Sequence, residues 1–215
     1  MKYAYYVSGN ATRLKSYLRD ETTDKSMIAF VLIDNVDNSE LSLLCESLGI
    51  PFHQYSYSLL GLKHKEQNTF ISNKLLRLLD ETGTDYCFVF GGRILVGQLL
   101  SKYHNKLINF HPALLPAYKG KAAIDQALHD HALLLGNTAH FINEELDSGT
   151  IIMHSLLPSV RFVDYDSVLD LQVPMLKQII FWLENDRFVF ENDKFYIKDA
   201  GYDMDTFIPN LERMA

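Results

Sequence analysis

Residues 86–92 read Tyr-Cys-Phe-Val-Phe-Gly-Gly, and the predicted fold is built around them. Five apolar residues form a run of strand length, and the two glycines interrupt it. A strand that is apolar on both faces is typical of a parallel sheet with helices packed on either side. We therefore expect residues 86–90 to form a central strand. The glycines then lie at the carboxyl edge of the sheet, where open α/β folds bind their ligands.

On both sides of this strand, apolar runs alternate with segments of helical period, which indicates strands joined by crossover helices. The alternation predicts a Rossmann-like, doubly wound α/β fold with a mostly parallel sheet. Residues 56–67 show no period and are expected to form a surface loop. Ser39 is expected to cap a helix that ends at Gly49, with Leu41, Leu43, Leu44 and Leu48 as its apolar face. The other expected strands are 3–7, 27–32, 51–55 and 107–110, and the other expected helices are 11–19, 70–82 and a short one from Val96.

After Pro116 the pattern changes. It predicts a helix over residues 122–130, two strands over 138–142 and 150–157, a long helix over 167–184 and a hairpin around residues 191–193. We therefore expect a C-terminal antiparallel or hairpin extension of the sheet. One domain is predicted over residues 1–198, followed by a C-terminal tail over residues 199–215 that docks on the domain or on a partner.

The composition excludes several classes of protein. The 215 residues carry a formal net charge of -7, whereas binding to nucleic-acid phosphates needs a basic face, so no nucleic-acid partner is expected. The sequence has neither a signal-peptide pattern nor an apolar run of ~18 residues, so we expect a cytoplasmic protein with no membrane partner. Cys45 and Cys87 stand in apolar stretches and are expected to be reduced thiols of the core.

Two polar residues stand out in the apolar segment Asn109-Phe110-His111-Pro112-Ala113-Leu114-Leu115-Pro116. Because side chains alternate along a strand, Asn109 and His111 are expected to face the same way. A histidine titrates near neutral pH, and an asparagine amide donates hydrogen bonds without titrating. Taken alone, the pattern also fits a half-buried histidine beside a proline-fixed turn.

A second polar segment covers residues 136–150. Asp147 is the candidate carboxylate, since a loop between two strands can return it to the ligand-binding edge of the sheet. An ordinary Asp-Ser-Gly turn is the alternative. His140 alternates with apolar residues and is expected to lie in the core or behind the site. Glu144 and Glu145 are expected to be solvated.

Together the two segments resemble the folate-dependent formyltransferase family, and in particular its purine-pathway branch. In that family an Asn-x-His-Pro-(Ser/Ala)-Leu-Leu-Pro segment is followed, a little over thirty residues later, by a loop that ends in Asp. Here His111 and Asp147 are 36 positions apart. The resemblance implies a formyltransferase that takes the formyl group from 10-formyltetrahydrofolate, uses no metal, and has Asn109, His111 and Asp147 as catalytic residues.

The chemistry of such a transfer gives each residue type a role. An amine attacks the formyl carbon, the formyl oxygen gains negative charge, and a proton leaves the attacking nitrogen. Asn109 and protonated His111 are expected to stabilise the charged oxygen. Asp147 is expected to favour the protonated form of His111 and to accept or relay the amine proton.

The resemblance also implies binding segments. The pterin is expected against the backbone of Arg93-Ile94-Leu95 and against the loop that contains Ile142, Asn143 and Asp147. The turn Gly9-Asn10-Ala11-Thr12-Arg13 joins a strand to a helix, so its backbone N–H groups are expected to hold a phosphate of the acceptor. Lys63, Lys65 and Pro112 are further candidates for acceptor contacts.

Three positions depart from the purine branch and leave the acceptor open. Arg13 and Ala11 stand where that branch has Asn and Gly, and Leu176 stands where it has a glutamate that binds ribose hydroxyls. We therefore expect a small phosphorylated or nucleotide-linked amine, such as an amino-sugar nucleotide, with glycinamide ribonucleotide as the alternative acceptor.

Two alternatives belong to other classes. A non-catalytic folate-binding module would keep the fold and lose part of the catalytic set. A metal hydrolase is suggested by His129-Asp130-His131, but that segment is expected at a helix end, where the two histidines point apart. The sequence makes no prediction of oligomeric state.

Overall fold

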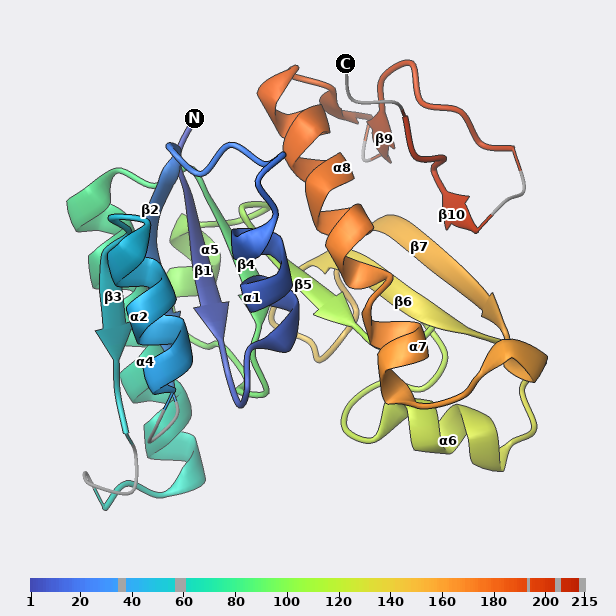
Figure 1. The fold of residues 1–215 in the computed structure, drawn as a ribbon, viewed down its shortest axis with the longest axis horizontal. Coiled ribbons are helices and arrows are strands. Elements are labelled where there is room, and N and C mark those ends of the chain that lie inside the picture. Colours follow the sequence, from blue (N-terminus) through green and yellow to red (C-terminus); the bar gives the residue numbers. More distant parts are fainter. Residues whose placement is uncertain (35–37, 57–60, 193, 204–205, 213–215) are drawn as a thin grey trace. The chain divides into compact units, whose positions relative to one another are not determined.

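The structure, a computed structural model, describes residues 1–34, 38–56, 61–192, 194–203 and 206–212. It consists of two compact units, Met1–Asn109 and Phe110–Ala215 (Figure 1). Strand β5 (Leu107–His111) crosses from the first unit into the second.

Among the described residues of the first unit, parallel strands pair in the order β5-β4-β1-β2-β3. Helices α1 and α2 lie on one face of this sheet, and α4 and α5 lie on the other (Figure 1). The mostly parallel, doubly wound sheet that the sequence predicts is confirmed. Its elements are β1 (Tyr3–Val7), α1 (Thr12–Arg19), β2 (Ile28–Ile33), α2 (Ser39–Ser47), β3 (Phe52–Gln54), α4 (His64–Thr82), β4 (Tyr86–Phe90) and α5 (Gln98–Lys102).

The core of the first unit is centred on β1. All five residues of β1 are buried, as the central place of this strand between β2 and β4 requires. Tyr3 and Tyr5 lie against Phe88 of β4, with ring centroids 5.9 and 5.6 Å apart. Such aromatic pairs stabilise a sheet beyond the area they bury, by about 0.5–1.5 kcal/mol each.

Two predictions about α2 are wrong: its capping residue and its apolar face. Helix α2 is capped by Asn38, whose side chain accepts a hydrogen bond from Leu41 N at 3.2 Å, and Ser39 is the first helical residue. Leu43 and Leu48 of its expected apolar face are 65% and 39% exposed, because the buried face consists of Leu41 and Cys45, one turn apart.

Helix α4 begins at His64, inside the segment that was expected to be a loop. Its start is fixed by Glu66, whose side chain accepts a hydrogen bond from Lys63 N at 2.8 Å. Residues 57–60 of the expected loop lie outside the described residues. The expected apolar stripe of this helix, from Ile71 to Leu79, is buried.

In the second unit, antiparallel strands β6, β7 and β10 pair in that order, and β8 and β9 form a separate hairpin, which confirms the C-terminal antiparallel extension. Asp193, which was expected in the turn of this hairpin, lies outside the described residues. Helices α7 and α8 run beside β6 and β7 (Figure 1). The elements are α6 (Ala123–His129), β6 (Leu134–Phe141), β7 (Ile151–Pro158), a 3-10 turn (Ser159–Arg161), α7 (Tyr165–Leu169), α8 (Gln172–Glu184), β8 (Phe188–Glu191), β9 (Lys194–Ile197) and β10 (Phe207–Ile208).

The single long helix that was expected over residues 167–184 is two helices, α7 and α8, with a break at residues 170–171. Pro174 explains the break, since it has no N–H for the carbonyl of Asp170 and its ring would clash with that carbonyl in a continuous helix. In the first turn of α8 the missing N–H costs little.

The described part of the C-terminal tail packs on the second unit. Phe207 and Ile208 pair with β7, and Glu212 accepts a hydrogen bond from Trp182 Nε1 of α8 at 2.9 Å. Glu212 also pairs with Arg187. A domain boundary at residue 198 stays a prediction.

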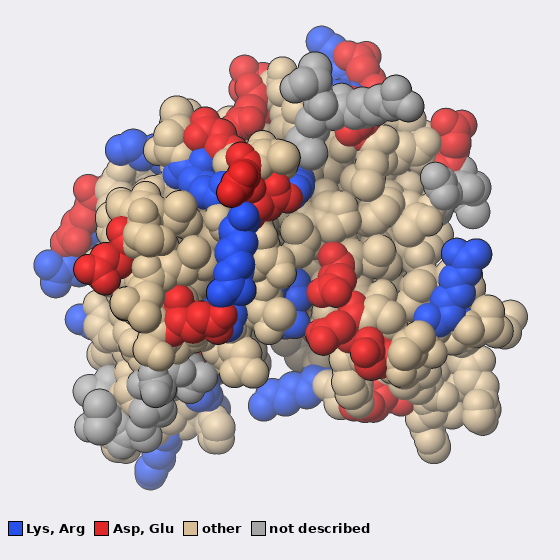
Figure 2. All heavy atoms as spheres, viewed as in Figure 1, with Lys and Arg blue, Asp and Glu red and all other residues tan. Residues whose placement is uncertain are grey.

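Cys45 and Cys87 are buried free thiols, and burial raises the pKa of Cys45 to about 11. None of the described helices is long and apolar enough to cross a membrane. On the face drawn in Figure 2, Lys and Arg side chains lie among Asp and Glu side chains.

Candidate active site

The candidate site of the second unit is built around His111 and Asp147. His111 is the last residue of β5, and Asp147 lies in the loop that joins β6 to β7. His111 Nδ1 is 3.4 Å from Asp147 Oδ2, and the two side chains are only 6% and 10% exposed. The structure therefore brings together the histidine and the carboxylate that the sequence singled out.

The segment after His111, residues 112–120, contacts both of these side chains through its backbone, and we call it the His111 loop. His111 Nε2 donates a hydrogen bond to the carbonyl oxygen of Tyr118 at 2.8 Å. Gly120 N donates to Asp147 Oδ2, also at 2.8 Å. Because a carbonyl only accepts, the Tyr118 contact places a proton on Nε2 and leaves Nδ1 facing the carboxylate.

His140 is buried behind Asp147, as the sequence predicts. Its Nδ1 donates to the carbonyl of Phe141 at 2.9 Å, and its Nε2 lies 3.7 Å from Asp147 Oδ1. Burial lowers the pKa of His140, and the hydrogen bond to Phe141 and the facing carboxylate only partly oppose this. Because Nδ1 donates to Phe141, Nε2 is the ring nitrogen that faces Asp147.

The loop that carries Asp147 is tightly closed at its base. Phe141 N donates to Thr150 O at 3.0 Å, and the backbone of Gly149 lies directly against the carbonyl of Phe141. Asp147 itself has a φ of 48°, a left-handed conformation that Asp and Asn adopt more readily than most residues. Asn143 bridges the loop by accepting hydrogen bonds from Glu145 N and Ser148 Oγ.

Asn109 is partly exposed and lies in β5, two residues before His111 and opposite Val89 of β4. Side chains two positions apart on a strand leave it on the same side. Pro112 follows His111 and is partly buried. Leu176, the expected departure on α8, is 1% exposed and belongs to the core.

In the first unit, the expected phosphate turn is open to solvent at its centre. Gly9 and Asn10 are exposed, and Gly9 has a φ of 60°. Ser8 Oγ accepts a hydrogen bond from Gly92 N at 2.7 Å, which ties this turn to the glycine pair after β4. Ala11 is the N-cap of α1 and has no side-chain acceptor for the first N–H groups of the helix. Thr12 is exposed and Arg13 is partly buried.

Arg93, expected to contribute only its backbone, also has a well-defined side chain. Its Nε lies 3.6 Å from Asp34 Oδ2, and one terminal nitrogen is 3.1 Å from His64 Nδ1. Asp34 is buried and also accepts a hydrogen bond from the Tyr6 hydroxyl at 2.8 Å. Asp34 was not among the predicted site residues; the available signal was its place directly after the apolar run of β2, at the carboxyl edge of the sheet. Ile94 is 51% exposed and Leu95 is 3% exposed.

The remaining candidates are surface groups. Lys63 and Lys65 are exposed at the start of α4, Ile142 is partly buried, and Asn143 is exposed. The segment His129-Asp130-His131 is exposed at the end of α6, and His131 has a left-handed φ of 53°. Among the described residues, no group of three or more His, Cys, Asp and Glu side chains is arranged to hold a metal ion.

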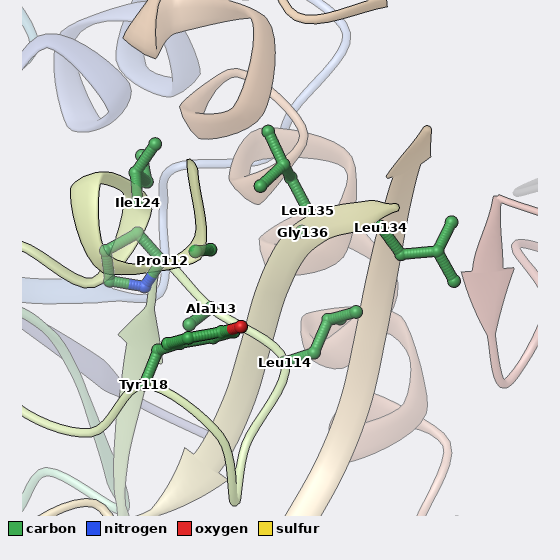
Figure 3. A pocket seen from close by; sticks show the side chains of 9 residues that line it. Pro112, Ala113, Leu114, Tyr118, Ile124, Leu134, Leu135 and Gly136 are labelled. Carbon is green, nitrogen blue, oxygen red and sulfur yellow. The ribbon is translucent and has the colours of Figure 1, made fainter. Parts of the chain in front are cut away.

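A small pocket lies beside the His111 loop (Figure 3). Its volume of about 10 Å³ has room for little more than one water molecule, so it cannot hold a pterin. The lining is mostly apolar and consists of Pro112, Ala113, Leu114, Tyr118, Ile124, Ala127, Leu134, Leu135 and Gly136.

Residues 1–169 match the model of the formyl transferase family, and the chain belongs to that family. The trifunctional purine biosynthetic protein adenosine-3 of Bos taurus is 31% identical over 161 residues, which are 74% of this chain and 15% of that protein. The formyltetrahydrofolate deformylase of Haemophilus influenzae is 36% identical over 127 residues, which are 59% of this chain and 43% of that enzyme. The chain thus spans less than half the length of these curated relatives.

Among solved structures, phosphoribosylglycinamide formyltransferase from Anaplasma phagocytophilum has a TM-score of 0.73 at 26% identity. The match covers 90% of this chain and 91% of that one. The similarity therefore extends past residue 169, where the family model ends, into the C-terminal part of the second unit.

Proposed function

We propose that this chain transfers the formyl group of 10-formyltetrahydrofolate to a primary amine of a small phosphorylated or nucleotide-linked acceptor. The observation that carries the proposal is the way His111 is held. Its Nε2 donates to a backbone carbonyl at 2.8 Å, and its Nδ1 faces a carboxylate at 3.4 Å. Because both side chains are almost fully buried, their charges act more strongly on a reacting group than they would in water.

Each member of the catalytic set has a distinct task in this proposal. Bound 10-formyltetrahydrofolate would supply an electrophilic formyl carbon. The acceptor nitrogen bonds to this carbon first, and the bond to the folate nitrogen then breaks as that nitrogen takes up a proton. Asn109 donates its side-chain N–H to the formyl oxygen as that oxygen becomes negative. His111 adds its ring dipole beside the same oxygen, held in place by Tyr118 O at Nε2 and by Asp147 at Nδ1. Asp147 takes the proton of the attacking amine, directly or through water, and the same route returns it to the leaving folate nitrogen.

Two segments fit the folate. The backbone of Arg93-Ile94-Leu95 offers hydrogen-bonding groups beside the half-exposed apolar side chain of Ile94, and a flat heterocycle needs both. The loop from Ile142 through Asn143 to Asp147 offers a second stretch of backbone, and its residues 143–146 are exposed. A closed loop base at Phe141 and Thr150 would keep this surface in place.

The acceptor is proposed to bind through its phosphate at the turn Gly9-Asn10-Ala11-Thr12-Arg13. The start of α1 is suited to an anion because Ala11 leaves its first N–H groups without a side-chain cap. Arg13 adds a guanidinium group, which can donate hydrogen bonds to two phosphate oxygens at once. Lys65 and Pro112 are proposed as further acceptor contacts. Leu176 is buried and cannot accept hydrogen bonds from sugar hydroxyls, which favours an acceptor other than glycinamide ribonucleotide.

One comparison favours a second candidate, hydrolysis. The deformylase relative is 36% identical, and the same His111–Asp147 pair could activate water in place of an amine. The formyl group would then leave as formate. Hydrolysis and amine transfer both release tetrahydrofolate, so only the fate of the formyl carbon separates them.

The test is to incubate the purified chain with 10-formyltetrahydrofolate and one of three additions: glycinamide ribonucleotide, a nucleoside-diphosphate amino sugar, or buffer alone. Tetrahydrofolate formation gives the rate, and mass spectrometry identifies the formylated product. The proposal predicts turnover with the amino-sugar nucleotide. Turnover with glycinamide ribonucleotide but not with the amino-sugar nucleotide supports the purine alternative. Formate release in buffer without any amine supports hydrolysis. Folate binding without turnover under all three conditions contradicts an enzymatic role.

A further inference from the structure

A buried threonine in β6, Thr138, holds the first half of the His111 loop. Its hydroxyl donates a hydrogen bond to the carbonyl of Ala113 at 2.6 Å and accepts one from Leu115 N at 3.0 Å. Thr138 is 0% exposed, so no water replaces these bonds. Ala113 and Leu115 lie two and four residues after His111, and Figure 3 shows the neighbouring Pro112, Ala113 and Leu114 on the same loop.

A third contact completes the hydrogen bonding of this hydroxyl. His154 Nδ1, on the paired strand β7, lies 3.0 Å from Thr138 Oγ1. A hydroxyl has one hydrogen, which Ala113 takes, so the two remaining contacts need it as an acceptor. His154 therefore carries a proton on Nδ1 and donates to Thr138. One donated and two accepted bonds use the full capacity of the hydroxyl.

The far end of the same loop returns to the candidate catalytic pair. Tyr118 O accepts from His111 Nε2, and Gly120 N donates to Asp147 Oδ2, each at 2.8 Å. The loop thus leaves β5 at His111, is held at Ala113 and Leu115 by Thr138, and returns to the side chains of His111 and Asp147. We expect a change at Ala113 and Leu115 to displace both of these backbone contacts together.

We propose that Thr138 is a positioning residue, which sets the orientation of His111 and Asp147 through the two hydrogen bonds of its hydroxyl to the His111 loop. This inference rests on the proposed function for its kinetic readout. Misplacing a reacting group by about 1 Å can cost up to about 100-fold in rate. Thr138 touches no reacting atom, so its loss lowers kcat and has little effect on the KM for the folate.

The test compares Thr138→Val, which keeps the shape and removes the hydroxyl, with Thr138→Ser, which keeps the hydroxyl. Thr138→Val is expected to lower kcat by about 10- to 100-fold, with a nearly unchanged KM. Thr138→Ser is expected to have a kcat near the wild-type value. The control is Thr84→Val in the first unit, where a buried threonine bonds the Thr82 hydroxyl at 2.7 Å. It should leave kcat unchanged.

Amide hydrogen exchange gives a readout that does not need activity. The Leu115 N–H should exchange faster in Thr138→Val than in the wild type, and slowly again in Thr138→Ser. In Thr138→Val, the NMR signal of the His111 Nε2–H should also be lost or shifted relative to the wild type. If wild-type chain turns over no 10-formyltetrahydrofolate, the proposed function fails, and these two signals still decide the role of Thr138.

A wild-type kcat in Thr138→Val overturns the proposal, and so does a Thr138→Ser variant as slow as Thr138→Val. If Thr138→Val does not fold, Thr138→Cys takes its place, because a thiol is a weaker donor and acceptor than a hydroxyl. It should give an intermediate kcat and faster Leu115 exchange. Wild-type values of both would overturn the proposal equally.

Discussion

Gly149 is expected to tolerate no side chain, although it is an ordinary residue of a turn sequence. A Cβ added at this position would lie 1.8 Å from the carbonyl oxygen of Phe141 and 2.8 Å from its carbonyl carbon. Packed carbon atoms lie about 3.5–4 Å apart. Gly149→Ala must therefore push the backbones of Phe141 and Gly149 apart by roughly 1 Å or more, at the base of the loop that carries Asp147.

The expected loss of stability follows from these contacts. The movement breaks or strains the hydrogen bond from Phe141 N to Thr150 O, which is 3.0 Å long. Such a bond contributes about 0.5–1.5 kcal/mol, and overpacking in a closed site costs about 1–3 kcal/mol. The free energy of unfolding should fall by about 2–4 kcal/mol, and Tm by roughly 4–16 °C, at ~2–4 °C per kcal/mol for a chain of this size.

Thermal unfolding followed by circular dichroism measures this change. Gly92→Ala is the matched control, since the nearest atom to its added Cβ is Ser8 Oγ at 4.0 Å. Its effect should stay within about 0.5 kcal/mol. The reasoning is refuted if Gly149→Ala unfolds at the same temperature as Gly92→Ala. A shift in Tm without a loss of turnover would show that the loop base can move without displacing Asp147.

Other predictions concern buried groups. Burial lowers the pKa of His140 below its ordinary 6.5, so its contribution to stability is complete above that pH and is lost as the pH falls from there toward the folded pKa. Between about pH 7.5 and 5.5, Tm should fall less in His140→Gln than in the wild type, and an equal fall contradicts this. Cys45 and Cys87 should resist a thiol reagent in the native chain and react after unfolding; rapid native labelling would contradict their burial. Glu212→Ala should lower stability by about 1–3 kcal/mol and shift the fluorescence of Trp182, and unchanged emission would place the tail elsewhere.

The sequence predicts much of the first unit because its strands are short apolar runs with clear ends. The expected strands at residues 3–7 and 86–90 match β1 and β4 residue for residue. Helix boundaries were less predictable, since they depend on which of two neighbouring residues caps the helix, as Asn38 and Ser39 show. The break before α8 had a signal in Pro174, but a strong apolar period on both sides masked it.

The candidate site was predictable where it rests on side chains. His111 and Asp147 were singled out by residue type and spacing, and the structure places them 3.4 Å apart. The contacts of Tyr118 and Gly120 could not be predicted, because they come from backbone atoms that any residue supplies. The burial of His140 behind Asp147 was predicted, but the irregular register of β6 and β7 at Ala139 and His140 was not, because alternation of polar and apolar residues does not reveal such a shift.

The central claim is that Asp147 and His111 work as a pair in formyl transfer, and the rate of tetrahydrofolate formation from 10-formyltetrahydrofolate in Asp147→Asn tests it most directly. Asparagine keeps the size of the side chain and removes its charge and its capacity to take a proton. Compared with the wild type, the rate should fall by roughly 10²–10⁴-fold, while Asp130→Asn, at the exposed end of α6, should leave it unchanged. A rate in Asp147→Asn equal to that in Asp130→Asn would contradict the account.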